Sequence, residues 1–298
     1  MSEVEEETKV FNDQSEHEIS REIYKICQDG YFTVFPVGFR AAGKTMLMSS
    51  IFRFSDRHPT KPFTVTPDKR YPFNTGNKQR DFMVQQFDAE ELMGRTAQGT
   101  LDLFGMSLNP DNLKLDKIKL NFIDISGEDI ANIKTSQNGE LTGKLKAVFS
   151  ALELYTSPVA FLLITPFTTN EENGDSEEDT LQANFINFLK TDYPSLYLNS
   201  KLFIIVTKWD QNNDPQYSVE QFIKEKRPSV YSLINGTNAI YGAYSIGTVL
   251  ELKESNEVTH AKLMTINEDY PWRFWNKLYE MTTGKSLIHK TWWQRLFS

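Results

Sequence analysis

Short, continuous apolar runs alternate along this chain with longer segments in which apolar residues recur every three or four positions. Continuous runs of this length are typical of strands buried on both faces, and the recurring pattern is typical of helices. The runs predict strands at residues 31–37, 101–108, 117–125, 159–165 and 201–206, and a last strand within 239–247. The recurring segments predict helices at 15–29, 44–54, 81–94, 181–189 and 218–235, and one from Pro271 onward. Because strands and helices alternate, we expect an α/β fold with a mainly parallel sheet and helices on both faces.

Turn-forming and helix-breaking residues divide these elements. Asn-Pro-Asp-Asn at 109–112 predicts a hairpin turn between the second and third strands, and a second hairpin is predicted within 248–266. Pro228 predicts a break in the helix that contains it. The acidic residues 168–179 predict a solvated surface loop.

The chain divides into one large domain and two terminal segments. Residues 1–14 are acidic and poor in apolar side chains, which predicts a flexible tail, and residues 15–284 carry the alternating pattern of a single domain. Residues 285–298 form an amphipathic segment with apolar side chains every four positions, at Ile288, Trp292 and Leu296. Such a segment packs either on its own domain or on a partner or membrane surface, and the sequence leaves both open.

Charge and cysteine content exclude several classes of protein. The 298 residues carry a formal charge of −8 with a pI near 5.2, so we expect neither nucleic-acid binding nor a general attraction to anionic lipid. Cys27 is the only cysteine, which excludes an intrachain disulfide and suits a reducing compartment. The acidic first residues predict no secretory signal, and the apolar run at 159–167 is too short to cross a membrane. We therefore expect a cytoplasmic protein.

A glycine-rich loop lies between the first predicted strand and the next predicted helix. Residues 38–45 read Gly-Phe-Arg-Ala-Ala-Gly-Lys-Thr, and this pattern binds phosphate when it joins a strand to a helix. Gly38 and Gly43 let the backbone N–H groups turn inward. Lys44 can reach the terminal phosphates, and the hydroxyl of Thr45 can bind Mg²⁺. We therefore expect a nucleoside triphosphate as ligand.

Three further motifs each follow an apolar run. Asp124 and Gly127 form an Asp-x-x-Gly pair, in which the carboxylate can hold Mg²⁺ and the glycine N–H can meet a γ-phosphate. Asp210 ends a Thr-Lys-Trp-Asp segment, and a carboxylate there can accept two parallel hydrogen bonds from guanine, whereas adenine lacks such a donor pair. Residues 245–247 form a turn whose N–H groups can bind the guanine O6. These motifs predict GTP rather than ATP.

With these motifs in this order, residues 20–282 resemble the Ras-like P-loop GTPases, and the Ser-Gly-Glu at 126–128 resembles the bacterial double-GTPase type. The resemblance implies a mainly parallel Ras-like P-loop GTPase sheet with insertions, a long first switch at about 56–100, and bound GTP or GDP with Mg²⁺. The implied nucleotide-binding residues are Gly38, Ala41, Ala42, Gly43, Lys44, Thr45, Met46, Gly127, Thr207, Lys208, Asp210, Ser245 and Ile246. The resemblance also implies a switch threonine that binds Mg²⁺ together with Thr45 and Asp124, at Thr100 or at Thr96.

Two positions depart from the family pattern and bear on catalysis. Glu128 stands where many Ras-like enzymes have a water-orienting glutamine, and its charge would repel the γ-phosphate, so we expect slow intrinsic hydrolysis. Arg40 lies in the phosphate loop, where small residues are usual in Ras proteins. It either swings over the phosphates as an arginine finger supplied in cis or points to solvent. Together with Lys44, these are the candidate catalytic residues.

The expected function is that of a molecular switch that hydrolyses GTP and contacts a protein effector or regulator through its switch regions. Three alternatives remain open. The first is a non-hydrolysing GTP-binding scaffold, which Glu128 favours, and the second is a partner-binding adaptor. The third is an ATP-dependent P-loop enzyme, against which Asp210 argues. Contact with a membrane is expected only through the C-terminal segment.

Overall fold

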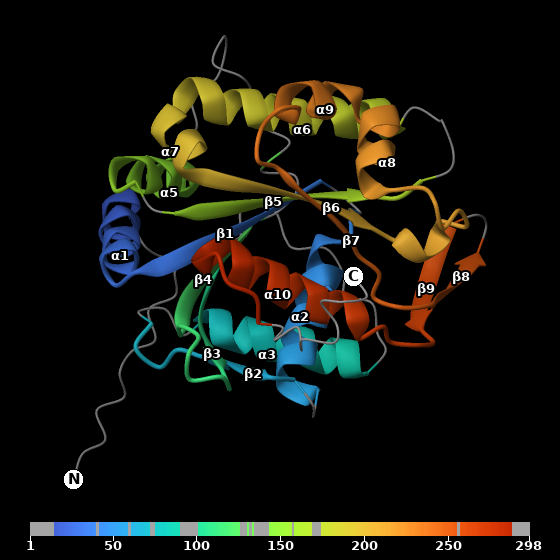
Figure 1. The fold of residues 1–298 in the computed structure, drawn as a ribbon, viewed down its shortest axis with the longest axis horizontal. Coiled ribbons are helices and arrows are strands. Elements are labelled where there is room, and N and C mark those ends of the chain that lie inside the picture. The colour runs from blue at the N-terminus through green and yellow to red at the C-terminus, as the bar shows by residue number, and fades with distance from the viewer. Residues whose placement is uncertain are drawn as a thin grey trace.

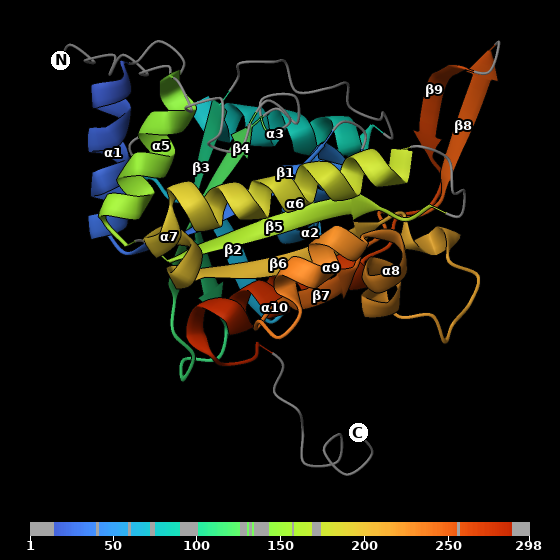
Figure 2. The ribbon, with the colours of Figure 1, turned by 90° about the horizontal axis from the view of Figure 1, so that it is seen from above.

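The structure is a computed structural model that describes residues 15–39, 42–58, 61–71, 75–89, 101–125, 130, 133, 143–156, 158–168, 174–254 and 257–287. A seven-stranded sheet in the order β2-β3-β4-β1-β5-β6-β7 forms its centre (Figure 1). The strands are β1 (Tyr31–Gly38), β2 (Phe63–Pro67), β3 (Leu101–Pro110), β4 (Ile118–Ile125), β5 (Val159–Pro166), β6 (Ser200–Thr207) and β7 (Ile240–Ala243). A separate antiparallel hairpin of β8 (Val249–Glu254) and β9 (Glu257–Leu263) projects from the body (Figure 2).

The sheet is mixed but mainly parallel. Strands β4, β1, β5, β6 and β7 run parallel to one another, whereas β2 and β3 are joined to the sheet by antiparallel pairing. The parallel strands are almost continuously apolar, because helices cover both of their faces. The expected α/β class with a mainly parallel sheet is therefore confirmed. The carboxyl ends of β1, β4, β5 and β6 meet at one edge of this sheet.

Two groups of helices enclose the sheet (Figures 1 and 2). One face is covered by α1 (Glu16–Gln28), α5 (Gly143–Leu154), α6 (Gly174–Asp192), α7 (Pro194–Asn199), α8 (Val219–Lys226) and α9 (Pro228–Ile234). The other face is covered by α2 (Lys44–Arg57), α3 (Thr75–Asp88) and α10 (Asp269–Thr283). Each face has its own apolar core, and both cores are rich in aromatic side chains.

The stretch predicted to hold a switch insertion contributes two elements to the fold. Strand β2, which the sequence did not predict, pairs with β3 from Phe63 opposite Pro110 to Pro67 opposite Met106. Strand β3 therefore continues to Pro110, and the hairpin turn predicted at 109–112 begins two residues later. Helix α3 also differs from the helix predicted at 81–94, because it begins at Thr75 and ends at Asp88. Its early turns are polar, but Arg80 is buried there and paired with acidic side chains.

The acidic segment at 168–179 is not a solvated loop throughout. Helix α6 begins within it, at Gly174. Asp179 is buried, and its two carboxylate oxygens accept hydrogen bonds from the backbone N–H groups of Ser229 and Val230, at 3.0 and 2.9 Å. These N–H groups belong to the first turn of α9, where no residue of α9 itself provides a side-chain cap. The prediction failed because this aspartate acts on a helix fifty residues away.

Candidate functional site

The glycine-rich loop joins β1 to α2 at the carboxyl edge of the sheet. Gly43 has a φ of +85°, a left-handed conformation that favours glycine, and α2 begins at the next residue. A β-carbon at Gly43 would lie 3.3 Å from Oγ1 of Thr207, so the loop is also packed tightly against β6. Thr45 and Met46 follow in the first turn of α2 and are half-buried. Arg40 and Ala41 lie outside the described residues.

Lys44 and Asp124 form a buried ion pair beside this loop. Lys44 Nζ lies 2.6 Å from Asp124 Oδ1, and the two side chains are 6% and 0% exposed. The second oxygen, Oδ2 of Asp124, is buried and has no hydrogen-bond partner within the described residues. A buried carboxylate oxygen without a partner is costly unless a cation or a donor binds it. The sequence prediction that these two residues share one site agrees with this geometry.

Asp102 joins this site as a carboxylate that the sequence analysis did not single out. It lies directly opposite Asp124 in the β3 and β4 pairing. Burial, together with the negative charge of Asp124, raises the pKa of Asp102 from 3.8 to about 6, although the charge of Lys44 opposes this shift. The register of the predicted hairpin is the signal that would have found it. Asp102 at the start of β3 and Asp124 at the end of β4 thus both interact electrostatically with Lys44.

Thr207 connects the glycine-rich loop to the end of β6. Its side chain is buried, and its hydroxyl Oγ1 donates a hydrogen bond to the carbonyl oxygen of Ala42 at 2.7 Å. The backbone carbonyl of Thr207 accepts a hydrogen bond from the N–H of Phe167 at 2.8 Å. The start of the Thr-Lys-Trp-Asp segment is therefore fixed to the loop and to the end of β5.

Asp210 is held in place from the segment after β7. Ser245 Oγ donates to Asp210 Oδ1 at 2.6 Å and accepts a hydrogen bond from the N–H of Gly247 at 3.1 Å. The Asp210 residue itself is exposed, so its carboxylate remains accessible to a ligand. Lys208 is exposed as well and has a φ of +55°. Ile246 is half-buried beside them, and its carbonyl accepts from the N–H of Asn267 at 3.0 Å.

Two tyrosines complete this end of the site, and the sequence analysis missed both. Tyr244 is buried, and its hydroxyl donates to Ser50 Oγ of α2 at 3.0 Å, while burial raises its pKa. Tyr270 lies in the first turn of α10, and its ring centroid is 6.0 Å from that of Tyr244. Burial raises the pKa of the Tyr270 hydroxyl, and the charge of Asp210 adds to this effect. An aromatic side chain therefore lies near the carboxylate that the sequence assigns to base recognition.

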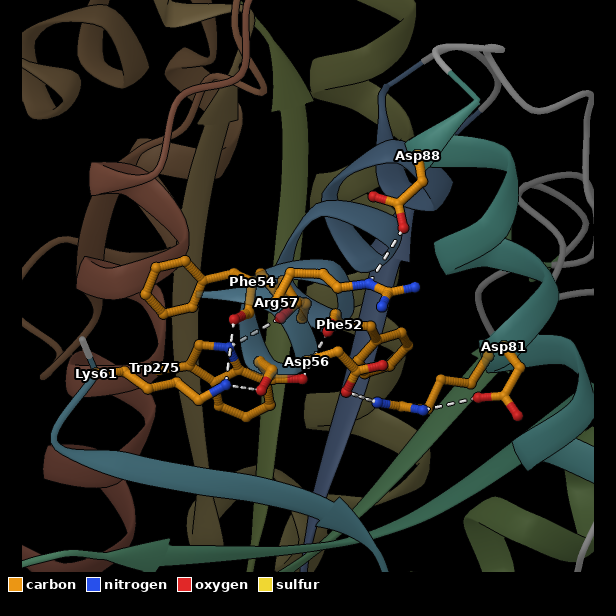
Figure 3. A network of polar contacts seen from close by, with 11 residues as sticks. Phe52, Phe54, Asp56, Arg57, Lys61, Asp81, Asp88 and Trp275 are labelled. Carbon is orange, nitrogen blue, oxygen red and sulfur yellow. Dashed lines mark hydrogen bonds and ion pairs between the residues drawn. The ribbon is translucent and has the colours of Figure 1, made fainter. Parts of the chain in front are cut away.

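A polar network fixes the rest of α2 (Figure 3). Trp275 of α10 donates from its indole Nε1 to the carbonyl oxygen of Ile51 at 3.1 Å. Lys61 donates to the carbonyl oxygens of Phe54 and Ser55 in the last turn of α2. The last carbonyl groups of a helix have no donor within the helix, so Lys61 supplies one. Burial lowers the pKa of Lys61. Contacts from α10 and from Lys61 therefore hold the C-terminal half of α2 in place. The N-terminus of α2 directly follows the glycine-rich loop.

Several predicted site residues lie outside the described part of the chain. They are Arg40, Ala41, Thr96, Thr100, Gly127 and Glu128. The described residues bring the others to one edge of the sheet in two groups. Gly38, Ala42, Gly43, Lys44, Thr45, Met46 and Asp124 form the first, and Thr207, Lys208, Asp210, Ser245 and Ile246 form the second.

We compared the chain with known protein families and with curated proteins. No protein-family model matches this chain, and no curated protein matches its sequence.

Within the described ranges, no three histidine, cysteine, aspartate or glutamate side chains gather in a way that could hold a metal. Among the helices described, none is both long and apolar enough to cross a membrane.

Proposed function

We propose that the protein binds GTP together with Mg²⁺, hydrolyses it to GDP and phosphate, and acts as a nucleotide-dependent switch of the Ras-like P-loop GTPase type. The observation that carries this proposal is the hydrogen bond from Thr207 to Ala42, which joins two motifs separated by 165 residues. A loop suited to phosphate and a carboxylate suited to guanine are thereby held at one sheet edge. The order β3-β4-β1-β5-β6-β7, with only β3 antiparallel to its neighbour, also supports the proposal.

The phosphate end of the site consists of Lys44 and the N-terminus of α2. The first N–H groups of a helix have no partner within it, and the helix dipole favours negative charge there. Lys44 adds a full positive charge that is already desolvated. In the proposed reaction Lys44 moves from Asp124 to the phosphates, where it stabilises the charge that develops during transfer to water.

The metal end fits Mg²⁺ by its chemistry. Mg²⁺ prefers oxygen ligands and is usually held by one or two carboxylates plus substrate phosphates. Thr45 and Asp124 would hold it, and the buried, unpartnered Oδ2 of Asp124 is the oxygen available for this. Bound Mg²⁺ would neutralise phosphate charge. Asp102 adds a second carboxylate that can accept hydrogen bonds from water around the ion.

The base end of the site supports the proposed choice of guanine. Asp210 is exposed, and Ser245 holds one of its oxygens, which restricts the orientation of the carboxylate. A carboxylate oriented in this way can accept hydrogen bonds from N1–H and the exocyclic amine of guanine. Adenine presents an acceptor at N1, so the carboxylate would face a second acceptor with no proton between them.

Competition titration with Mg²⁺ present tests base choice. Wild-type protein should bind GTP much more tightly than ATP, and Asp210→Asn should shift the preference from guanine to xanthine nucleotides. Asp214→Asn, which changes another exposed aspartate of the same loop, is the matched control and should bind like wild type. Equal affinity of the wild type for ATP and GTP would favour an ATP-dependent enzyme and reject the assignment.

Hydrolysis and switching need their own measurement. Conversion of bound GTP in a single turnover separates the switch from a non-hydrolysing scaffold, which would retain GTP unchanged. Hydrogen exchange of residues 95–100, compared between a non-hydrolysable GTP analogue and GDP, tests the switch. Protection that depends on Thr100 would assign the metal-binding threonine to that residue, and protection that depends on Thr96 would assign it there. Equal exchange in both nucleotide states would argue against a switch in this segment.

A further inference from the structure

The turn predicted to bind the guanine O6 is joined to the segment that follows the projecting hairpin. The turn consists of residues 245–247, and we call residues 264–267, between β9 and α10, the return segment. The hairpin of β8 and β9 separates these two stretches in the chain, and its antiparallel pairing brings its two ends side by side. The return segment therefore lies beside the base end of the site.

Gly247 packs directly against the backbone of the return segment. Its φ of +127° is left-handed, which favours glycine. A β-carbon on this residue would overlap the carbonyl oxygen of Thr265 and would lie 3.1 Å from Cα of Ile266. No side chain larger than a hydrogen atom therefore fits between the turn and the return segment, and the return segment limits where the turn can lie.

Hydrogen bonds cross the root of the hairpin beside this contact. Within the described residues, three backbone N–H groups donate across the root. They are those of Asn267 to the carbonyl of Ile246 at 3.0 Å, Met264 to the carbonyl of Thr248 at 2.8 Å, and Thr248 to Oγ1 of Thr265 at 3.1 Å. These bonds continue the pairing of β8 with β9, which begins with Val249 opposite Leu263. The turn is therefore an extension of the hairpin at its root.

Two helices hold the return segment in place. Oδ1 of Asn267 accepts hydrogen bonds from the N–H groups of Asp269 and Tyr270 in the first turn of α10, at 2.9 and 3.4 Å. The next residue, Glu268, forms an ion pair with Arg53 of α2 at 2.6 Å. Helix α2 begins at the glycine-rich loop, so one helix supports both the phosphate end of the site and the return segment.

Contacts continue from the turn to the carboxylate that is proposed to read guanine. The N–H of Gly247 donates to Oγ of Ser245 at 3.1 Å, and this hydroxyl donates to Oδ1 of Asp210 at 2.6 Å. The position of Gly247 therefore influences where Ser245 holds the carboxylate. A shift of Gly247 would disturb both the carboxylate and the N–H groups of the turn.

We propose that Thr265 and Asn267 are positioning residues for the guanine base, an inference that rests on the proposed binding of GTP. Thr265 meets Gly247 through its carbonyl group, and Asn267 holds the carbonyl of Ile246 through its N–H. The N–H groups of the turn and the Asp210 carboxylate are thereby held in place before a ligand arrives. A site ordered in advance binds more tightly, because fewer groups must be immobilised on binding. Guanine affinity therefore depends on the return segment.

The hairpin of β8 and β9 acquires a role in this arrangement. It projects from the body (Figure 2) and joins it through the turn and the return segment. Movement of the hairpin at its root would change the contact between Gly247 and Thr265. The position of the hairpin therefore affects how firmly the base is held.

Binding of GTP and 6-thio-GTP to the full chain, measured by calorimetry with Mg²⁺ present, tests the proposal. The analogue has sulfur in place of O6 and keeps both N–H donors proposed to bind Asp210, and sulfur is the weaker acceptor. Wild-type protein should prefer GTP about fivefold, the size expected for one hydrogen bond. In Gly247→Ala the added methyl group displaces the turn, so GTP affinity should fall at least about tenfold and the preference for O6 should disappear.

Gly236→Ala is the matched control, because Gly236 is also left-handed, with a φ of +79°, but a β-carbon there would meet no described atom within 4 Å. It should bind both nucleotides like wild type. Asn267→Ala is a milder second variant, which removes the acceptor for the first turn of α10. It should lose most of the preference for O6, whereas Asn267→Asp, which keeps an acceptor oxygen, should retain it.

Hydrogen exchange of residues 245–247 in the nucleotide-free protein separates the positioning role from the proposed function. Exchange should be faster in Asn267→Ala than in the wild type, because the support of the turn is weakened before any ligand binds. Unchanged exchange would overturn the positioning role alone, as would a wild type that selects GTP over ATP but not over 6-thio-GTP, or an unchanged preference for O6 in both Gly247→Ala and Asn267→Ala. Equal binding of GTP and ATP by the wild type would reject GTP recognition itself, and the positioning role would fall with it.

Discussion

Removing the charge of Lys44 while Asp124 stays buried is the sharpest test of the ion pair. In Lys44→Met, a side chain of similar length fills the same space but leaves the Asp124 carboxylate without its partner at 2.6 Å. Asp102 lies opposite, so two neighbouring carboxylates would then face each other without a cation between them. We expect the nucleotide-free variant to be strongly destabilised at neutral pH.

The expected size follows from the burial of both side chains, which are 6% and 0% exposed. Breaking a buried pair by removing one partner costs about 3 to 5 kcal/mol, because the remaining charge is uncompensated. For a chain of 298 residues, such a loss corresponds to a fall of about 5 to 8 °C in the unfolding midpoint. Replacing both partners, with Lys44→Met and Asp124→Leu together, should restore most of the loss, since no unpaired charge remains.

The loss should also depend on pH. Lys44 opposes the rise in the pKa of Asp102, which is about 6 in the wild type, so Lys44→Met should raise this pKa further. A carboxyl group whose pKa is raised by folding binds more protons in the folded state, so stability falls as pH increases through that window. Lys44→Met should therefore lie closer to wild type at pH 5 than at pH 8.

Circular dichroism during heating, without nucleotide, measures these differences. Lys224→Met, which changes an exposed lysine of α8, is the control and should unfold at the wild-type temperature. The reasoning fails if Lys44→Met matches wild type at pH 8. It also fails if the double variant is no more stable than the single one.

Further outcomes are expected for five individual residues. Burial raises the pKa of Asp102 from 3.8 to about 6, so its ionisation lowers stability as pH rises through that window. Asp102→Asn should therefore resist urea better than wild type at pH 7.5, and equal resistance would contradict this. Thr207→Val removes the donor to the phosphate loop and should weaken GTP binding about tenfold by calorimetry, whereas Thr207→Ser should not. Asp179→Ala should destabilise the protein by about 1 to 3 kcal/mol in urea unfolding, because two N–H groups lose their acceptor; a loss within error would refute this. Glu128→Gln should speed single-turnover hydrolysis by removing a charge near the γ-phosphate, and Arg40→Ala should slow it at least about tenfold if the arginine acts as a finger.

The main strands and the meeting of Lys44 with Asp124 could be predicted because their signals are local. A continuous apolar run such as β5 indicates a strand without knowledge of its neighbours, and a carboxylate at the end of such a run lies at the sheet edge. The break at Pro228 and the hairpin of β8 and β9 were also predicted, since proline and turn residues act where they stand.

The remaining features depend on residues far apart in the chain. Strand β2 has only two buried side chains, Phe63 and Val65, and becomes a strand by pairing with β3. The perturbed pKa of Asp102 depends on the register opposite Asp124, and an aspartate in that position has no distinctive local pattern. Asp179 lies in a run of acidic residues that resembles an exposed loop, and only the location of α9 explains its burial.

The cap that α6 provides to α9 also sets an order of assembly. Helix α9 has seven residues, far fewer than the roughly 12 to 15 that an isolated helix needs to be even marginally stable in water. Among the described residues, the Asp179 carboxylate is the acceptor for two N–H groups of its first turn. The turn therefore gains its partners only after α6 has docked on the sheet. We therefore expect helix α9 to form late in folding, and we expect it to open in the native protein when α6 detaches.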